Sequence, residues 1–258
     1  MKTVSLYDYP ELYDSLRTPS PAVFQQVWEV ICQHLGRQPH SVMDPACGPA
    51  TWLGYFAERG VPVAGNDIEP GMVQAARKKC GAQAFEIIEG DMRDLKFQRG
   101  PFEVSFELSG TCGMLADEQN FRRFLRTVSD HTASGGLVMV TIFFPEPACE
   151  IPYVVDSWAA QVNGKGHARI TYEVIDTHPS RFVDRVRRSV ATDGLPQCPA
   201  TLVDEYDMFS WHENHFAEVM ADYPELLFSC SYAINNDVLH FTDPGHQRGE
   251  TTVVFRRL

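Results

Sequence analysis

The sequence predicts a doubly wound α/β fold, with a mostly parallel sheet covered by helices on both faces and a small antiparallel cap inserted after the fifth strand. Short apolar segments alternate with amphipathic segments through residues 41–143. This alternation is typical of a parallel sheet whose crossover connections are right-handed. From about residue 146 the pattern changes to strands that carry charge on one face, which is typical of a half-exposed antiparallel pair.

Individual elements follow from local signals. Residues 1–20 have little periodicity and are expected to form an arm or lid. A helix is predicted over residues 21–35, because Ser20 can cap it, Pro21 suits its first position and Gly36 suits its end. Strands are then predicted over 41–44, 61–66, 84–89, 102–108 and 137–143, and helices over 51–59, 71–79 and 118–129.

The second half of the chain is predicted to leave the core and return to it. Cap strands are expected over 167–176 and 182–190, a helix over 212–222, and strands over 227–233 and 251–256. We therefore expect three parts: an N-terminal arm and helix (1–36), an α/β core (37–145 and 207–258), and an inserted antiparallel cap for substrate (146–206).

Composition and charge limit the possible partners. The chain has 258 residues, 44% of them hydrophobic, and a formal net charge of −12. Such a charge disfavours binding to a phosphate backbone, so no nucleic acid is expected. No apolar run reaches the roughly 18 residues of a membrane span and no secretory signal is evident, so we expect a cytoplasmic protein. A small-molecule partner is expected, and the oligomeric state, monomer or dimer, stays open.

Seven cysteines are scattered along the chain without a C-x-x-C pair. An odd, dispersed set is typical of reduced thiols. We expect neither a disulfide framework nor a metal site.

The turn after the first strand, "DPACGPA", is the first candidate for a ligand site, because ligands of parallel sheets bind at the carboxyl ends of the strands. A carboxylate, Asp44, ends that strand; it would repel a diphosphate and favour a cation. Small residues at Ala46 and Gly48 permit close approach to the backbone. Asp67 follows at the spacing of about 20 residues that is typical of a ribose-binding acid. These features favour a ligand with an adenosine-like body and a positively charged tail.

Four segments in this order resemble class I S-adenosylmethionine-dependent methyltransferases, which have a Rossmann-like core: "VMDPACG", "VAGNDIEPGM", "IEGDMRDL" and "HTASGGLVMV". Within that family, "GDMRD", "FEVSFELSGTCGML" and "FFPEP" are most similar to the amino-sugar N,N-dimethyltransferases of macrolide biosynthesis. Ala50 departs from the pattern, since the family usually has a third glycine there.

The resemblance implies S-adenosyl-L-methionine as the cofactor. Asp44 would hold its methionine ammonium, while Ala46 and Gly48 would let the backbone pass close to it. Asp67 would accept hydrogen bonds from the ribose hydroxyls, with Ile68 against the adenine.

Two further residues would bind the adenine. Asp91 would accept from its amino group, and Met92 would cover the ring, because a thioether suits an aromatic face.

The reaction implied is an in-line SN2 methyl transfer, most simply N-methylation, because an amine needs only a free lone pair. Tyr13 and Glu107 are the candidate catalytic residues: Tyr13 lies on the arm with Tyr7 and Arg17, and Glu107 ends the fourth strand, where it could also hold the methionine portion. O-methylation of a hydroxyl or carboxylate is an alternative, as is a non-catalytic S-adenosylmethionine-binding protein. A nicotinamide dehydrogenase is disfavoured by Asp44 and the missing glycines.

Other polar and aromatic residues have two interpretations each, in the site or in ordinary packing. His212 and His215 lie three residues apart on a predicted helix and could face one ligand or solvent. The remaining candidates are His131 at a helix end; His167 and His178 beside substrate; Tyr153, Trp158 and Trp211 as an apolar lid or as packing; and Cys47 and Cys112 as packing residues.

Overall fold

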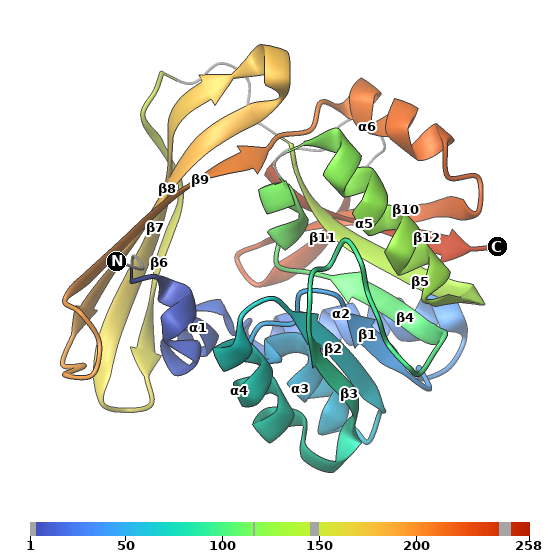
Figure 1. Ribbon diagram of the computed structural model, residues 1–258, viewed down its shortest axis with the longest axis horizontal. Coiled ribbons are helices and arrows are strands. Elements are labelled where there is room, and N and C mark those ends of the chain that lie inside the picture. The colour runs from blue at the N-terminus through green and yellow to red at the C-terminus, as the bar shows by residue number, and fades with distance from the viewer. Residues whose placement is uncertain (1–3, 116, 145–149, 243–248) are drawn as a thin grey trace.

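The computed structural model describes residues 4–115, 117–144, 150–242 and 249–258. The described strands form one eight-stranded and one four-stranded sheet (Figure 1). Parts of some predictions lie outside the described residues: the last residues of "FFPEP" (145–147), the predicted start of the cap at 146, and Cys149.

The large sheet has the strand order β11-β10-β12-β5-β4-β1-β2-β3. Strands β1 to β5 run parallel to one another, and β12 runs antiparallel to β5. The order reverses at β1, which lies between β2 and β4, so the crevice beside β1 is the expected ligand position. Its strands are β1 (Val42–Asp44), β2 (Val63–Asp67), β3 (Ala84–Glu89), β4 (Phe102–Glu107), β5 (Thr132–Phe144), β10 (Leu226–Asn235), β11 (Val238–Thr242) and β12 (Gly249–Arg257).

Helices cover both faces of this sheet, which confirms the doubly wound fold. One face packs against α2 (Pro21–Leu35), α3 (Thr51–Ala57) and α4 (Pro70–Cys80). The other packs against α5 (Glu118–Asp130) and α6 (Glu213–Ala221). Neighbouring strand residues alternate between the two cores, as Val42 and Met43 of β1 do. The predicted start of α2 is confirmed, since the Ser20 hydroxyl accepts from the Val23 N–H.

The second sheet is antiparallel, with the order β6-β7-β8-β9, and lies to one side of the core (Figure 1). Its strands are β6 (Tyr153–Val162), β7 (Gly166–His178), β8 (Val183–Asp193) and β9 (Thr201–Phe209). The prediction of two strands here was incomplete: β6 and β9 were missed. β9 also continues past residue 206, where the expected cap ends. β6 gave little signal because most of its side chains are exposed, so its hydrophobicity does not alternate.

The N-terminal arm contains a helix that was not predicted, α1 (Pro10–Arg17). Leu12 and Leu16, one turn apart, are buried against the second sheet in a cluster with Ile170. Trp158 of β6 fixes this contact, because its indole Nε1–H donates to the Leu16 carbonyl at 2.6 Å. The arm is therefore packed onto the second sheet as well as lying beside the core.

Ala50 occupies a left-handed backbone conformation at the start of α3, with φ of 64°. A glycine adopts this conformation without strain, whereas an alanine pays a steric cost. Its buried methyl group packs among the residues beneath α3, which offsets part of that cost.

Among the described residues, no helix is long and apolar enough to cross a membrane.

Candidate active site

A cavity of about 420 Å³ opens at the carboxyl ends of β1, β2 and β3. Its volume lies within the range of small-molecule and cofactor sites. The residues that line it come from the arm, the three strand ends, α4, the segment before α5 and α5 itself: Tyr7, Tyr13, Pro45, Ala46, Gly48, Asn66, Asp67, Ile68, Glu69, Met72, Gly90, Asp91, Met92, Arg93, Thr111, Met114, Leu115 and Asn120. Six of the seven predicted cofactor residues are therefore brought together here, and Asp44 lies directly behind them.

Asp44 is buried at the end of β1, with 4% of its surface exposed. Its Oδ1 accepts a hydrogen bond from the Ala46 N–H at 2.9 Å. Burial raises the pKa of Asp44 well above its usual range, and repulsion from Glu107 and Asp67 adds to the shift. None of the described basic side chains pairs with Asp44, so this buried carboxylate is electrostatically suited to a positively charged ligand group.

Asp67 ends β2 and joins the first two strand ends. Its Oδ2 accepts from the Gly48 N–H at 2.8 Å, and its Oδ1 accepts from the Glu69 N–H at 2.9 Å. Each oxygen keeps acceptor capacity for a ligand hydroxyl. Burial raises the pKa of Asp67, although the two backbone N–H groups favour its ionised form. Ile68 follows with 66% of its surface exposed at the cavity.

Asn66 was not predicted as a site residue, and it joins the turn after β1 to the turn after β3. Its amide Nδ2–H groups donate to the Pro45 carbonyl and to the Gly90 carbonyl, both at 2.9 Å. A side-chain amide at the penultimate position of β2 was the only sequence signal.

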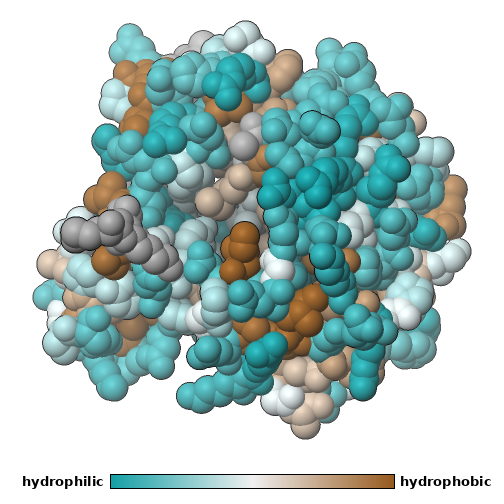
Figure 2. All heavy atoms as spheres, in the orientation of Figure 1, coloured by the Kyte–Doolittle hydropathy of each residue, from teal (hydrophilic) through white to brown (hydrophobic). Residues whose placement is uncertain are grey.

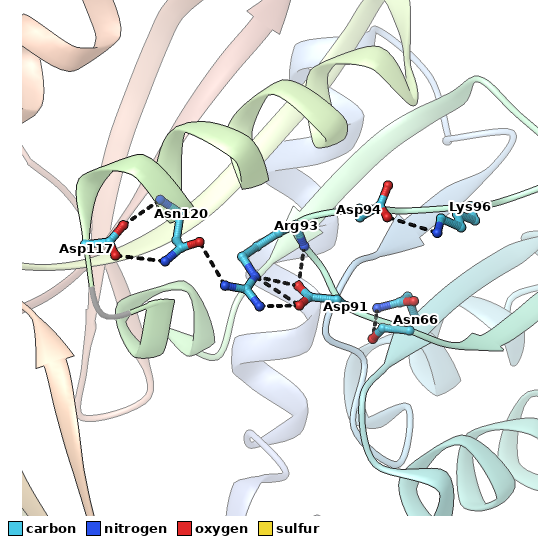
Figure 3. A network of polar contacts seen from close by, with 8 residues as sticks. Asn66, Asp91, Arg93, Asp94, Lys96, Asp117 and Asn120 are labelled. Atoms are coloured by element: carbon cyan, nitrogen blue, oxygen red, sulfur yellow. Dashed lines mark hydrogen bonds and ion pairs between the residues drawn. The ribbon is translucent and has the colours of Figure 1, made fainter.

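Beyond β3, Asp91 lies in a polar network (Figure 3). Arg93 Nε donates to Asp91 Oδ1 at 2.9 Å, and Arg93 Nη1 donates to Asn120 Oδ1 at 2.8 Å. The Arg93 guanidinium lowers the pKa of Asp91, so this carboxylate is ionised and held in place. Arg93 and Asn120 were missed because they are ordinary loop and helix residues until folding places the start of α5 beside the loop after β3.

The arm closes one side of the cavity. Tyr13 lies over the β1 turn, where a Cβ on Gly48 would be 3.5 Å from Tyr13 Cε1. The ring of Tyr7 lies 5.7 Å from that of Tyr13, and its hydroxyl contacts Met114 Sδ at 3.5 Å. Burial raises the pKa of Tyr13, so its hydroxyl is neutral. Met92 and Met114 supply polarizable apolar surface in the same cavity.

Glu107 is buried at the end of β4 and does not line the cavity. Its carboxylate accepts from the backbone N–H groups of Ser109 at 2.9 Å and Thr111 at 3.0 Å, and from that of Cys112 at 3.3 Å. Its observed contacts therefore shape the loop after β4.

The remaining candidates lie away from the cavity. His215 Nε2 pairs with Glu118 Oε2 at 2.7 Å, and His212 is exposed beside Phe182. Trp211 is buried against Phe121 in the core. His131 ends α5, with Nδ1 on the Thr127 carbonyl.

Three more candidates belong to the second sheet: Tyr153 starts β6, and His167 and His178 lie on β7. Cys47 and Cys112 are buried, and burial raises the pKa of both thiols, in keeping with packing roles.

Comparison with known proteins identifies the domain that contains the cavity. Residues 42–136 match the family described as "Methyltransferase domain". The chain carries a methyltransferase domain. The sequence-based resemblance to class I S-adenosylmethionine-dependent methyltransferases is thereby confirmed, with S-adenosyl-L-methionine as the cofactor of this domain.

The chain is also similar to individual methyltransferases. A dTDP-3-amino-3,4,6-trideoxy-α-D-glucopyranose N,N-dimethyltransferase of Streptomyces venezuelae is 26% identical over 60% of this chain. The matched region spans 62% of that relative's own length, which is less than two thirds. A dTDP-4-amino-2,3,4,6-tetradeoxy-D-glucose N,N-dimethyltransferase of Saccharopolyspora spinosa is 26% identical over 74% of this chain and 76% of its own. The structure of S-adenosylmethionine-bound CalS10, an amino pentose methyltransferase from Micromonospora echinaspora, shares the fold, with a TM-score of 0.70, 15% identity and 99% of each chain covered.

The cavity fits this cofactor by its chemistry. Asp67 has acceptor capacity for ribose hydroxyls, and Met92 offers a thioether surface to an adenine. Asp44 supplies the negative charge that a methionine ammonium needs, directly or through water. Gly48 keeps the turn open, because its φ of 54° is one that other residues rarely adopt.

Proposed function

We propose that the protein transfers methyl groups from S-adenosyl-L-methionine to the amino group of a small sugar substrate. One observation supports this most directly: the cofactor cavity is bounded by the arm residues Tyr7 and Tyr13, and the arm in turn packs on the second sheet. The acceptor then lies between the two sheets. The two N,N-dimethyltransferases to which the chain is similar act, by their names, on nucleotide-linked amino sugars.

The residues have separate roles in this proposal. Asp44, Ala46, Gly48, Asp67, Ile68, Asp91 and Met92 bind the cofactor. S-adenosyl-L-methionine supplies an electrophilic methyl group on its sulfonium when bound. Tyr13 orients the reacting groups, and the arm keeps water away from them, because in-line transfer depends on position and a dry site. Glu107 acts indirectly: it holds the loop after β4, and Thr111 of that loop lines the cavity.

Each part of the fold has its own role in the proposed reaction. In this proposal the α/β core binds the cofactor, the arm with α1 and α2 covers it, and the second sheet, β6 to β9, is the substrate cap, which extends to Phe209 rather than to the expected residue 206. The expected cytoplasmic location, the absence of a nucleic-acid partner and the monomeric or dimeric state stay predictions from the sequence.

A direct assay tests the proposal. The protein is incubated with S-adenosyl-L-methionine and a dTDP-linked amino sugar of the kind named for the relatives, and the products are analysed by mass spectrometry. The expected result is a sugar with one or two added methyl groups and formation of S-adenosylhomocysteine. A matched sugar with a hydroxyl in place of the amine should stay unmodified; its methylation would favour the O-methyltransferase alternative. Tight cofactor binding without turnover of any amine would favour a non-catalytic protein.

A further inference from the structure

Glu250 lies at the edge of the large sheet where the parallel strands end, although no sequence motif indicated it. β12 runs antiparallel to β5, so its first residues lie at the edge where the parallel strands end, and Glu250 pairs with Phe143 of β5. Its carboxylate faces the loop after β4, where a Cβ on Gly110 would be 3.6 Å from Glu250 Oε1. The next residue, Thr111, lines the cofactor cavity. Glu250 therefore lies beside the residue that precedes Thr111 of the cavity lining.

Charged groups from three parts of the protein meet around Glu250. Arg17 of α1 attracts it, and Asp156 of β6 repels it. Arg17 is itself fixed to the loop after β4, because its guanidinium donates to the Ser109 carbonyl at 3.0 Å. Glu250 thus faces the space between the arm, the core and the second sheet. Figure 2 shows the surface hollowed between the second sheet, at the left, and the core.

The environment of Glu250 suits a proton acceptor. Its side chain still reaches solvent, yet the surrounding protein desolvates it enough to raise the pKa of its carboxyl group. Within the part of the chain that the structure describes, no hydrogen bond or ion pair occupies its carboxylate. Glu107, by contrast, has three backbone N–H donors. Of these two carboxylates, Glu250 is the one with acceptor capacity to spare.

We propose that Glu250 binds the acceptor amine and accepts its proton, an inference that rests on the proposed N-methylation. An amine binds as its ammonium ion at neutral pH, and the carboxylate attracts it. One N–H bond then breaks as an O–H bond forms, so both charges are neutralised and the electron pair stays on nitrogen. That pair forms the new N–C bond as the C–S bond breaks. The proton on Glu250 returns to solvent after product leaves.

The first experiment compares the wild type with Glu250→Gln, which keeps the size of the side chain and removes its basicity. The amino sugar nucleotide of the assay above is the probe. General base catalysis is worth roughly 10²–10⁴-fold, so kcat/KM for the amine should fall by at least about 10²-fold. The Kd for S-adenosylhomocysteine, measured by calorimetry, should stay within about twofold, which shows that the variant is folded. A kcat/KM within about twofold of the wild type, with its pH profile unshifted, overturns the assignment.

A second variant tests the charge environment without touching Glu250. Asp156→Asn removes a negative charge that raises the pKa of Glu250, so the acid limb of the kcat/KM profile should move to lower pH. Asp193→Asn is the matched control, because Asp193 is an exposed carboxylate at the far end of the same sheet, and it should leave the limb in place. The amine itself titrates in the same direction in every variant, so only the difference reports on Glu250. Equal profiles for both variants overturn the proposal.

These results are separable from failure of the proposed function. A wild type that binds S-adenosylhomocysteine but methylates no amine overturns the proposed function, and with it the role of Glu250. A wild type that methylates the amine, together with an unaffected Glu250→Gln variant, overturns the role of Glu250 alone.

Discussion

The backbone N–H of Gly48 donates to the Asp67 carboxylate across 2.8 Å, which joins the turn after β1 to the end of β2. One carboxylate therefore has two functions: it holds the turn that must approach a ligand, and it presents acceptor capacity to that ligand. This pairing explains why a loop with only one of the usual glycines can still be positioned for binding.

Substitution of Asp67 tests the ribose assignment. Asp67→Asn keeps an acceptor for Gly48 but loses the charge, and Asp67→Ala loses both. The alanine variant should weaken S-adenosylhomocysteine binding by about 2–3 kcal/mol, and the asparagine variant by less, because hydrogen bonds to charged groups are the stronger ones. Calorimetry measures both. Asp94→Ala, a change at an exposed aspartate outside the cavity lining, is the control. Unchanged affinity in Asp67→Ala would mean that the ribose binds elsewhere.

Replacing Asp44 should stabilise the ligand-free protein and weaken cofactor binding. Burial raises the pKa of Asp44, so the folded protein retains a proton that the unfolded chain releases above about pH 4. The free energy of unfolding therefore falls as pH rises from there through the raised pKa. Asp44→Asn should raise the Tm of the ligand-free protein at neutral pH, with little difference near pH 4 or below. Thermal denaturation over a pH series measures this.

The same Asp44→Asn variant should bind S-adenosylhomocysteine more weakly, by about 1.5–3 kcal/mol for a lost interaction with a charged group. A Tm lowered equally at every pH would show instead that Asp44 is a purely structural residue.

Removing the Tyr13 hydroxyl should lower kcat and leave the affinity for S-adenosylhomocysteine nearly unchanged. The ring of Tyr13 lies beside the β1 turn and its hydroxyl is neutral, so we expect the hydroxyl to orient a reacting group and to contribute little to cofactor affinity. Tyr13→Phe should lower kcat by roughly tenfold, about the worth of one hydrogen bond, with the S-adenosylhomocysteine Kd within about twofold. Tyr9→Phe, on the same arm but outside the cavity lining, should change neither. Steady-state kinetics that match the wild type would leave Tyr13 with packing alone.

Two substitutions of Ala50 should change the free energy of unfolding by different amounts: glycine by little and valine by more. Ala50→Gly relieves about 1–2 kcal/mol of left-handed strain but removes a buried methyl group worth about 0.8 kcal/mol, so its stability should change by no more than about 1 kcal/mol. Ala50→Val places a β-branched side chain at φ of 64° and should cost more than about 2 kcal/mol. Urea denaturation compares the three proteins. A valine variant as stable as the wild type would exclude strain at this turn.

The core was predictable because its signals are local. β2 and β3 each contain a short apolar stretch bounded by Gly, Pro or Asp, and the motifs at Asp44, Asp67 and Asp91 indicate which strand ends bind the ligand. The arm helix was missed because Tyr and Pro residues obscure the period of Leu12 and Leu16. Contacts between distant segments gave no signal, so the pairing of Arg93 with Asn120 and the place of Glu250 beside Gly110 emerge only after folding.

A crystal structure with S-adenosylhomocysteine and the amino sugar nucleotide bound tests the central claim most directly. We predict that the ribose hydroxyls lie within hydrogen-bonding distance of Asp67 and that the sugar nitrogen lies between the ligand sulfur and Glu250. A ligand bound with its ribose away from Asp67, or with the sugar outside the space between the two sheets, would contradict the account.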